Sequence, residues 1–306
     1  MKIRFENFWT GFRPESSLLG EWCAAAFGSY RTVTKRSVPV DIAITSVMAF
    51  PTKAKRAAAL SGSFFSRGRR LAYREAMEYG IPLKSGPARR RVWYTGENIR
   101  PPEGFDLTLS FDLDDYGGTN LYAPFWLDRV SVNGASASER VAIPAEVLTS
   151  DRIIERVPPR FCAAVMSNPH PMRLRAIEAL RSIGRVDVYG RAYGRPLADK
   201  AAVLSEYRFN LAFENDLYPG YVTEKVIDAW SAGCVPLWWG IDPAGYVDPQ
   251  SVVNLAECGS LRTFLDVVAA LDADNDGWRA MAEHKLMMRR FDHEEVIRAI
   301  RSLAES

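Results

Sequence analysis

The feature that most constrains the fold is a pattern of strand, helix and strand that occurs twice in the second half of the chain. Apolar residues run continuously in the expected strands and recur at helical spacing between them. Consecutive units of this kind favour a parallel sheet covered by helices. We expect the elements at residues 161–166, 171–183 and 186–189 in the first unit, and at residues 209–213, 223–232 and 234–239 in the second.

Local residues mark the ends of both expected helices. Pro171 suits a first helical turn, because proline has a fixed φ and no N–H that would lack a partner there. Gly184 can close this helix in a left-handed conformation. Thr223 suits the N-cap of the second helix, and Gly233 stands where a helix-ending glycine is common.

The first half of the chain also alternates strand-like and helix-like segments, which predicts an α/β protein. A length of 306 residues favours two domains. The Pro-rich segment 152–160 is a stiff connector, so we expect domains at residues 1–155 and 156–306. The expected elements are strands at 2–5, 40–47, 92–94 and 105–111, a helix at 69–79, and a helical tail from Leu261 with a later stretch at 278–303.

Composition and charge exclude several classes of protein. Lys and Arg total 39 against 37 for Asp and Glu, so a net charge of +2 gives no general reason for nucleic-acid binding. No apolar run reaches about 18 residues, and the first residues lack the apolar core of a signal peptide. The four cysteines do not have metal-ligand spacing. We expect a cytoplasmic protein without a metal site or a nucleic-acid partner.

Three charged residues at the beginnings of the expected helices suit an anionic ligand. Arg173 follows the first strand, whereas Glu224 and Lys225 open the second helix. Helix N-termini at the carboxyl edge of a parallel sheet bind anions, and a guanidinium can hold a diphosphate bidentately. The alternative is that Arg173 is solvated like Arg175 and Arg181, and that Glu224 only complements the helix dipole. Lys225 opposes that dipole, which favours an anion beside it.

Three blocks of sequence resemble those of one enzyme family. Residues 209–240, FNLAFENDLYPGYVTEKVIDAWSAGCVPLWWG, resemble the donor-site signature of the α1,3/4-fucosyltransferases, with FEN, YVTEK and a strand ending in WG. Residues 92–112, VWYTGENIRPPEGFDLTLSFD, and 167–173, SNPHPMR, resemble upstream blocks of the same family in the same order. The chain is therefore similar to bacterial members of this family over residues 92–240.

This resemblance implies a fold and a reaction. The fold is the GT-B architecture, in which two Rossmann-like domains face each other across a cleft, with the acceptor domain first and the donor domain second. The reaction is an inverting transfer of L-fucose from GDP-fucose to a GlcNAc-type residue of a bacterial glycan such as lipopolysaccharide. The implied partners are GDP-fucose and an oligosaccharide or glycolipid acceptor. No cofactor is required, and a stimulatory divalent ion is left open.

The resemblance also implies roles for individual residues. Glu97 of the YTGEN block is the implied general base, and the preceding Gly96 permits a tight turn. Arg173 and Lys225 are placed on the diphosphate, and Glu224 on the ribose. The other implied nucleotide-sugar-binding residues are Ser167, Asn168, Glu214, which organises its loop, and Asn215 and Tyr221, which lie near the nucleotide or sugar.

Other functions are compatible with the same residues. A GT-B enzyme for another nucleotide sugar or acceptor would keep the nucleotide site, and a non-catalytic glycan-binding or membrane-binding relative would keep the fold. Basic clusters at 53–56, 67–70 and 89–91 suit anionic head groups, so peripheral membrane association is open, although such clusters are usually solvated. Asp112 and Asp114 spell a metal-binding DxD pattern, for which a solvated loop is the favoured interpretation.

Several aromatic residues of the first half offer flat faces for a sugar ring, although packing in the core accounts for them equally well. Residues 120–125 keep the Tyr and Pro of the family pattern but lack the basic residue that many relatives have before the proline. The identity of the acceptor is therefore open. The candidate stacking residues are Phe8, Trp9, Tyr122, Phe125 and Trp126.

Overall fold

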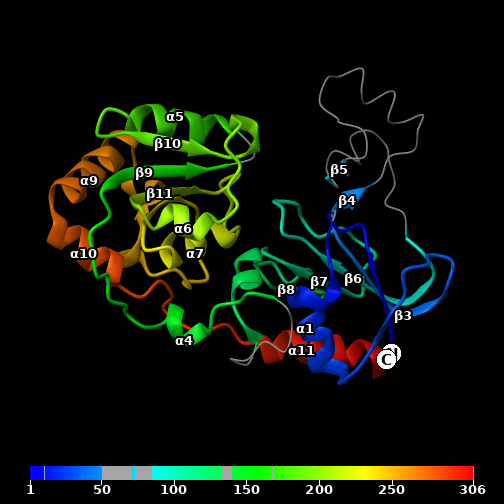
Figure 1. The fold of residues 1–306 in the computed structure, drawn as a ribbon. Helices are drawn as coiled ribbons and strands as arrows, with labels where there is room; N and C mark the ends of the chain where they lie inside the picture. The colour runs from blue at the N-terminus through cyan, green and yellow to red at the C-terminus, as the bar shows by residue number, and fades with distance from the viewer. Residues whose placement is uncertain (10, 50–70, 73–84, 133–139, 167–168, 306) are drawn as a thin grey trace, which may run out of the picture. The chain divides into compact units, whose positions relative to one another are not determined.

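The chain forms two α/β units (Figure 1). The computed structural model describes residues 1–9, 11–49, 71–72, 85–132, 140–166 and 169–305. Contacts group Met1–Asp128, Val132–Val141 and Asp292–Ser306 in the N-terminal unit, and Arg129–Ser131 and Ala142–Phe291 in the C-terminal unit.

The C-terminal unit is built on a parallel sheet with the strand order β10-β9-β11-β12-β13. Strands covered on both faces require continuous apolar runs. The central strand β11 accordingly is buried at every position except Arg208. The strands are β9 (Arg160–Val165), β10 (Val186–Tyr189), β11 (Tyr207–Phe213), β12 (Val235–Trp239) and β13 (Val253–Asn254).

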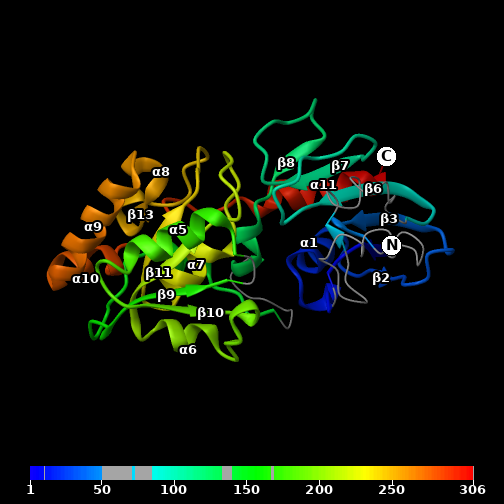
Figure 2. The same ribbon diagram turned by 90° about the horizontal axis from the view of Figure 1, so that it is seen from above.

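Helices cover both faces of this sheet (Figure 2). On one face, α5 (Pro171–Leu180) and α9 (Leu261–Ala273) join the larger apolar core. On the other face, α6 (Lys200–Leu204) packs Leu204 into a smaller core. The other helices of this unit are α4 (Ala145–Leu148), α7 (Glu224–Ser231), α8 (Leu255–Cys258) and α10 (Asn275–Glu283), with 3-10 helices η4 (Arg191–Tyr193) and η5 (Pro249–Ser251).

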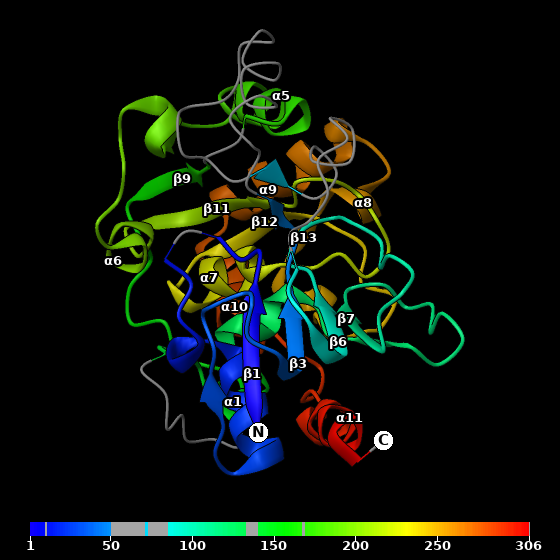
Figure 3. The same cartoon turned by 90° about the vertical axis from the view of Figure 1, so that its right-hand side faces the viewer.

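The N-terminal unit has a second parallel sheet, with the order β2-β1-β3-β6-β7-β8 (Figure 3). Its strands are β1 (Lys2–Glu6), β2 (Arg31–Thr32), β3 (Val40–Thr45), β6 (Ala88–Tyr94), β7 (Leu107–Ser110) and β8 (Asn120–Tyr122). The short strands β4 (Met48–Ala49) and β5 (Leu71–Ala72) form a separate antiparallel pair. Helix α1 (Leu18–Phe27) and the 3-10 helices η1 (Pro14–Ser16) and η2 (Phe125–Arg129) complete the elements described before the C-terminal unit.

The last helix, α11 (His293–Glu305), returns to the N-terminal unit and runs beside α1 in Figures 1 and 2. Nε1 of Trp22 donates to Nδ1 of His293 at 3.1 Å, and Arg301 donates to the main-chain oxygens of Ala25 and Ala26. The contacts therefore divide the chain differently from the expected domains at 1–155 and 156–306, because the apolar face of the last helix packs against the first helix. This face consists of Val296, Ile297, Ile300 and Leu303.

The predicted fold class, with two parallel α/β units, is confirmed. Two predicted details are wrong: the left-handed conformation at Gly184, and the continuous helical stretch at 278–303. Gly184 is not among the described residues with a positive φ, and a Cβ at this position would lie 2.6 Å from the ring of Phe161. Close packing, rather than a left-handed conformation, therefore requires this glycine. Gly233 does have a positive φ, of 96°, after α7.

The helical stretch expected at 278–303 is interrupted at residues 284–292. There the backbone bonds to other segments, with Met287 N donating to Leu148 O and Met288 N donating to Tyr246 O, both at 2.8 Å. The helix expected at 69–79 lies outside the described residues except at Leu71–Ala72, which form β5. In the described ranges, no helix combines the length and the apolar character that crossing a membrane would require.

The buried pair of Trp22 and His293 makes stability depend on pH. Burial, with a smaller contribution from Arg140, lowers the pKa of His293 to about 4. Nδ1 must be unprotonated to accept the indole N–H. An unfolded histidine titrates near 6.5, so the unfolded state binds the proton first as the pH falls. This contribution to the free energy of unfolding is complete above about pH 6.5 and decreases, by up to about 3 kcal/mol, toward pH 4.

We expect His293→Asn, whose Oδ1 can still accept from Trp22, to show a weaker loss of stability between about pH 6.5 and 4. The measurement is denaturant unfolding of both proteins across this range, followed by tryptophan fluorescence. An identical pH dependence in the variant would show that other groups cause the loss.

Candidate functional site

The carboxyl ends of β9 and β11 lie next to each other, and a helix follows each of them. From β9 the chain passes through α5 to β10 on one side, and it returns as β11 on the other side of β9. This is a topological switch point, where open parallel sheets bind ligands. The topology therefore places a candidate site at the beginnings of α5 and α7.

Arg173, in the first turn of α5, is buried rather than solvated. The residue is only 5% exposed, whereas Arg175 and Arg181 on the same helix are exposed. Its Nε and Nη2 atoms donate to the main-chain oxygen of Phe213, the last residue of β11. This contact spans the switch point. The interpretation of Arg173 as a solvated helix residue is therefore wrong.

A fully buried carboxylate, Glu214, organises the connection from β11 to α7. Its Oε1 accepts from the main-chain N–H of Thr223 at 2.9 Å, and its Oε2 accepts from the Thr223 hydroxyl at 2.6 Å. The main-chain N–H of Glu214 donates to Trp239 O at 3.2 Å. A charge removed from water requires such partners. Glu214 therefore closes the loop and ties it to the end of β12.

Lys225 joins this carboxylate from the first turn of α7. Its Nζ lies 3.2 Å from Oε2 of Glu214 and 2.7 Å from Oγ1 of Thr223, and 3.9 Å from Oε1 of Glu224. Thr223 occupies the N-cap position, but its side chain makes no capping hydrogen bond to the helix. The predicted N-cap position is therefore confirmed, but the hydroxyl links Glu214 and Lys225, so the residue also belongs to the charged cluster.

The charges of the cluster act on one another. Burial alone would lower the pKa of Lys225, but the carboxylates of Glu214 and Glu224 outweigh it, and the pKa is raised. The charge of Arg173 opposes this increase, so the two cations lie within Coulombic range. Burial lowers the pKa of Arg173, with Glu214 as the largest opposing influence. Two cations held together at two helix N-termini suit a ligand with several negative charges.

Other predicted donor-site residues lie at the same edge of the sheet. Tyr221 is fully buried, and it lies close enough to Arg173 to influence the pKa of that guanidinium. Glu224 is the first residue of α7, and Asn215 is half-buried directly after Glu214. Ser167 and Asn168 lie outside the described residues. The structure thus brings most of the predicted set together, and their binding roles stay predictions.

Glu97, the predicted base, lies in the N-terminal unit in a turn directly after β6. The Thr95 hydroxyl donates to the main-chain oxygen of Glu97 at 2.9 Å and accepts from its N–H at 3.0 Å. A Cβ on Gly96 would lie 2.5 Å from the ring of Phe125, so this close approach requires glycine. The turn therefore fixes the backbone of Glu97, and its catalytic role stays a prediction.

The structure separates the aromatic candidates of this unit by exposure. The side chains of Phe8 and Trp126 are only 3% and 2% exposed, so these two rings pack in the core. Tyr122 and Phe125 are half-buried, whereas Trp9 is 38% exposed. The rings of Trp9 and Phe125 meet edge to face, with their centroids 6.4 Å apart. Because Phe125 also contacts Gly96, Trp9 offers the most accessible ring beside the Glu97 turn.

Asp112 and Asp114 bond within their own turn. Asp112 is 5% exposed and accepts from the Tyr116 hydroxyl at 2.7 Å, so the solvated-loop interpretation is wrong for this residue. Oδ1 of Asp114 accepts from the N–H of Tyr116 at 2.8 Å. Across the described ranges, no group of three or more His, Cys, Asp and Glu residues is arranged to hold a metal ion.

The basic clusters give no further structural support for a membrane surface. The clusters at 53–56 and 67–70 lie outside the described residues. In the third cluster, Arg90 pairs with Asp106 at 3.1 Å, and Arg91 donates to Gly86 O at 3.0 Å. Peripheral membrane association therefore stays a prediction.

The sequence did not identify two contacts of the site. The main-chain oxygen of Phe213 is the partner of Arg173, and Thr223 is the partner of Glu214. A signal was present for Thr223, because a carboxylate directly after an apolar strand requires donors nearby. No residue type marks a main-chain acceptor, so the Phe213 contact had no comparable signal.

Comparison with known proteins identifies relatives over much of the chain. Residues 159–296 match the family model described as Glycosyltransferase family 10 (fucosyltransferase) C-term. The chain is 30% identical over 240 residues to the alpha-(1,3)-fucosyltransferase FucT of Helicobacter pylori. This alignment covers 66% of this chain and 50% of that protein. It is 27% identical over 215 residues to human 3-galactosyl-N-acetylglucosaminide 4-alpha-L-fucosyltransferase FUT3, with coverage of 63% and 53%. The chain thus spans about half the length of these relatives.

Solved structures share the fold. A crystal structure of an alpha1,3-fucosyltransferase matches with a TM-score of 0.70 and 21% identity, and one with GDP-fucose matches with a TM-score of 0.69 and 20% identity. Each match covers 100% of this chain and 90% of the solved chain. At these identities the likeness concerns the fold, and it confirms the GT-B type. With the family match, it confirms the predicted resemblance to the α1,3/4-fucosyltransferases.

The bonds of Glu214 predict a large effect on stability. We expect Glu214→Ala to lower the free energy of unfolding by roughly 3–5 kcal/mol, because Thr223 and Lys225 lose their buried partner. Glu178→Ala is the matched control, since Glu178 pairs with Arg181 on an exposed face and should cost at most about 1 kcal/mol. Equal losses in denaturant unfolding would contradict the structural role of Glu214.

Proposed function

We propose, from the match of residues 159–296 to the C-terminal region of glycosyltransferase family 10, that this protein is an inverting α1,3/4-fucosyltransferase. It transfers L-fucose from GDP-fucose to a hydroxyl of a GlcNAc-type residue in a bacterial glycan. The observation that carries this proposal is the cluster of Arg173, Glu214 and Lys225 at the switch point of the C-terminal sheet. A nucleoside diphosphate is the class of ligand that suits such a cluster.

We assign separate residues to each part of GDP-fucose. Arg173 and Lys225 bind the diphosphate. A guanidinium has five N–H donors, so Arg173 can bond the Phe213 carbonyl and an anion at the same time. Glu224, at the start of α7, accepts from the ribose hydroxyls. The residues assigned to the rest of the nucleotide sugar are Ser167, Asn168, Asn215 and Tyr221.

The chemistry is a single displacement at the anomeric carbon. An acceptor hydroxyl attacks that carbon as GDP leaves from the opposite face, which inverts the configuration. Glu97 removes the proton of the hydroxyl, a contribution of roughly 10² to 10⁴ in rate. Arg173 and Lys225 stabilise the negative charge that develops on the departing diphosphate. The base and the cations thus act on different bonds of the same step.

The acceptor is an oligosaccharide or glycolipid, such as a precursor of lipopolysaccharide. Relatives named for transfer to galactosyl-N-acetylglucosaminides support a GlcNAc-type acceptor. On the protein side, the exposed ring of Trp9 beside the Glu97 turn is suited to stack on a sugar. We assign acceptor stacking to Trp9 rather than to the buried rings of Phe8 and Trp126.

The proposed reaction requires no resident cofactor, because two protein cations already face the leaving group. A divalent ion, where present, stimulates turnover by adding to this charge. We place the enzyme in the cytoplasm, where the donor would reach it, with peripheral association at the inner membrane if the acceptor is lipid-linked. Nucleic acid is not a proposed partner, since the net charge of +2 provides no basis for it.

Two alternatives give different results in the same assay. Release of GDP from GDP-fucose in the presence of N-acetyllactosamine supports fucosyl transfer. Activity only with a different nucleotide sugar would support another GT-B transferase. Binding of glycans without turnover of any donor by the wild-type protein would support a non-catalytic relative.

We expect Arg173→Ala and Lys225→Ala each to weaken binding of GDP by roughly tenfold to a hundredfold, because each loses charge-assisted bonds worth about 1.5–3 kcal/mol. Calorimetric titration with GDP measures the change. Arg175→Ala is the control, since this arginine is exposed on the same helix. Unfolding midpoints of all variants show whether a loss of affinity reflects a loss of fold. Wild-type affinity in folded Arg173→Ala or Lys225→Ala would contradict the donor assignment.

Replacing the base should separate turnover from binding. We expect Glu97→Gln to lower kcat by roughly 10² to 10⁴ while GDP-fucose affinity changes little, because the amide cannot accept the proton. Rate assays at saturating donor and calorimetric titration provide the two values. Unchanged kcat would remove Glu97 from this role.

Loss of the Trp9 ring should affect the acceptor alone. We expect Trp9→Ala to raise the acceptor KM about threefold to tenfold, with the donor KM unchanged and partial recovery in Trp9→Phe. Initial rates with varied N-acetyllactosamine and varied GDP-fucose distinguish the two constants. An equal rise in both would indicate a general structural effect.

A further inference from the structure

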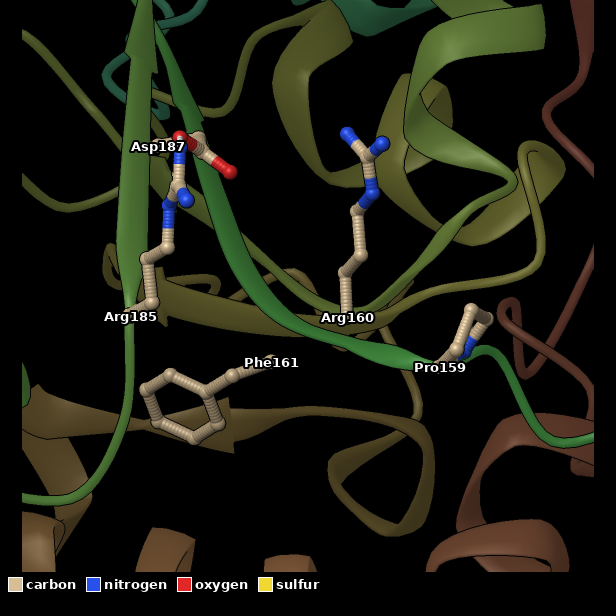
Figure 4. Close-up of a pocket in the computed structure, with 5 residues that line it drawn as sticks. All are labelled: Pro159, Arg160, Phe161, Arg185 and Asp187. Atoms are coloured by element: carbon tan, nitrogen blue, oxygen red, sulfur yellow. Dashed lines mark hydrogen bonds and ion pairs between the residues drawn. The ribbon is translucent and has the colours of Figure 1, made fainter.

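A pocket lies at the opposite edge of the C-terminal sheet from the candidate donor site. It has a volume of about 400 Å³, within the usual range for small-molecule sites. Arg160 begins β9 and Arg185 directly precedes β10, so the pocket lies at the amino ends of these strands. The length of β9 separates the two edges by about 20 Å. The lining residues are Pro159, Arg160, Phe161, Arg185 and Asp187 (Figure 4).

A buried hydrogen-bond network anchors two arginines of this pocket. Asp187 is 7% exposed, and its Oδ1 accepts from Nε and Nη2 of Arg185 at 3.1 and 3.0 Å. Its Oδ2 accepts from the hydroxyl of the fully buried Tyr207 at 2.9 Å. Nη1 of Arg160 donates to that hydroxyl at 3.2 Å, and the Tyr189 hydroxyl lies 2.7 Å from it. The carboxylate thus positions Arg185 directly, whereas Arg160 is positioned through the hydroxyl of Tyr207.

The geometry presents these guanidinium groups to a common space. In Figure 4, Arg160 and Arg185 extend in the same direction from neighbouring strands, with the carboxylate of Asp187 close to the end of Arg185. Arg195 adds a third cation, with Nη1 3.7 Å from Asp187 and its guanidinium carbon 4.2 Å from the centroid of Tyr189. Among these described residues, Arg185 and Arg195 pair with Asp187, and Arg160 is linked to it through Tyr207, so three guanidinium groups surround one carboxylate group and its bound hydroxyl.

The dipoles of neighbouring helices account for only part of this arrangement. Helices α5 and α6 end shortly before β10 and β11, and cations near helix C-termini interact favourably with the helix dipole. That effect requires neither a pocket nor a buried anchor. Burial would raise the pKa of Asp187, but the hydrogen bond from Tyr207 and the two hydrogen bonds from Arg185 to Oδ1 lower it, which keeps the carboxylate ionised. The network therefore holds the arginines in place through a buried carboxylate. An interaction with helix dipoles alone would not require that carboxylate to be buried.

We propose that this pocket binds a phosphate monoester. The excess of positive charge suits a dianion, and paired guanidinium groups match the geometry of phosphate oxygens. A phosphate between Arg160 and Arg185 would leave most of the volume unfilled, so the ligand carries an organic group. The site is separate from the proposed donor site and does not depend on its assignment.

The test is a titration of the protein with phenyl phosphate, followed by ligand-observed NMR in the presence of saturating GDP. We expect saturable binding to the wild-type protein and at least a tenfold loss of affinity in Arg160→Gln and in Arg185→Gln. Arg181→Gln is the matched control, because Arg181 is an exposed arginine on α5 that pairs with Glu178. The same titration of Arg173→Ala, without GDP, keeps the result independent of the nucleotide site.

A second arm distinguishes the source of the phosphate. Cosedimentation with phosphatidylcholine vesicles that contain phosphatidic acid, lost in Arg160→Gln and Arg185→Gln, would assign the site to a lipid head group. Binding of phenyl phosphate without cosedimentation would assign it to a soluble ligand. Equal affinity for phenyl phosphate in wild type, Arg160→Gln and Arg185→Gln, or no saturable binding by the wild type, would overturn the proposal. Unfolding midpoints are measured for both variants, because Arg185 bonds the buried Asp187 and Arg160 bonds the buried Tyr207, and only a loss of affinity in a folded variant supports the site.

Discussion

The buried carboxylate of Glu214 is the interaction on which the rest of the C-terminal site depends. Removing a carboxylate from water costs several kcal/mol, so the bonds from Thr223 and Lys225 must form whenever the sheet folds. They hold the start of α7 against the end of β11. Arg173 adds a tie from α5 to Phe213, the residue before Glu214. The strand order creates the switch point, and these contacts fix the cationic cluster there, so a ligand at this edge meets groups that are already in place.

This pre-organisation connects the fold to the proposed chemistry. Charged groups that are held before the reaction stabilise a leaving diphosphate without rearranging, which is the largest contribution that a transferase of this type can make through its donor site. The N-terminal unit provides a different kind of support. There the Thr95 bonds and the contact between Gly96 and Phe125 hold the turn that carries Glu97, with the exposed ring of Trp9 beside it.

Much of the fold was predictable from sequence because its signals are local. Strand β10 was placed at its observed bounds, and Pro171 and Gly233 mark helix ends as expected. Contacts between elements that are distant in the sequence were not predictable. The apolar face of α11 is visible in the sequence, but nothing in it identifies α1 as the partner. For the site, YVTEK and FEN contain Glu214, Thr223 and Lys225, which the structure brings together, and their binding roles stay predictions. The inward direction of Arg173 and the bond between Thr223 and Glu214 arise from the meeting of strands distant in sequence.

The central claim is that Arg173 and Lys225 receive one diphosphate at the carboxyl edge of the C-terminal sheet. A crystal structure of the protein soaked with GDP tests it most directly. We expect the diphosphate to contact both side chains, at the beginnings of α5 and α7, while Glu214 keeps its bonds to Thr223. GDP bound at another place, or bound at this edge without contact to either cation, would contradict it.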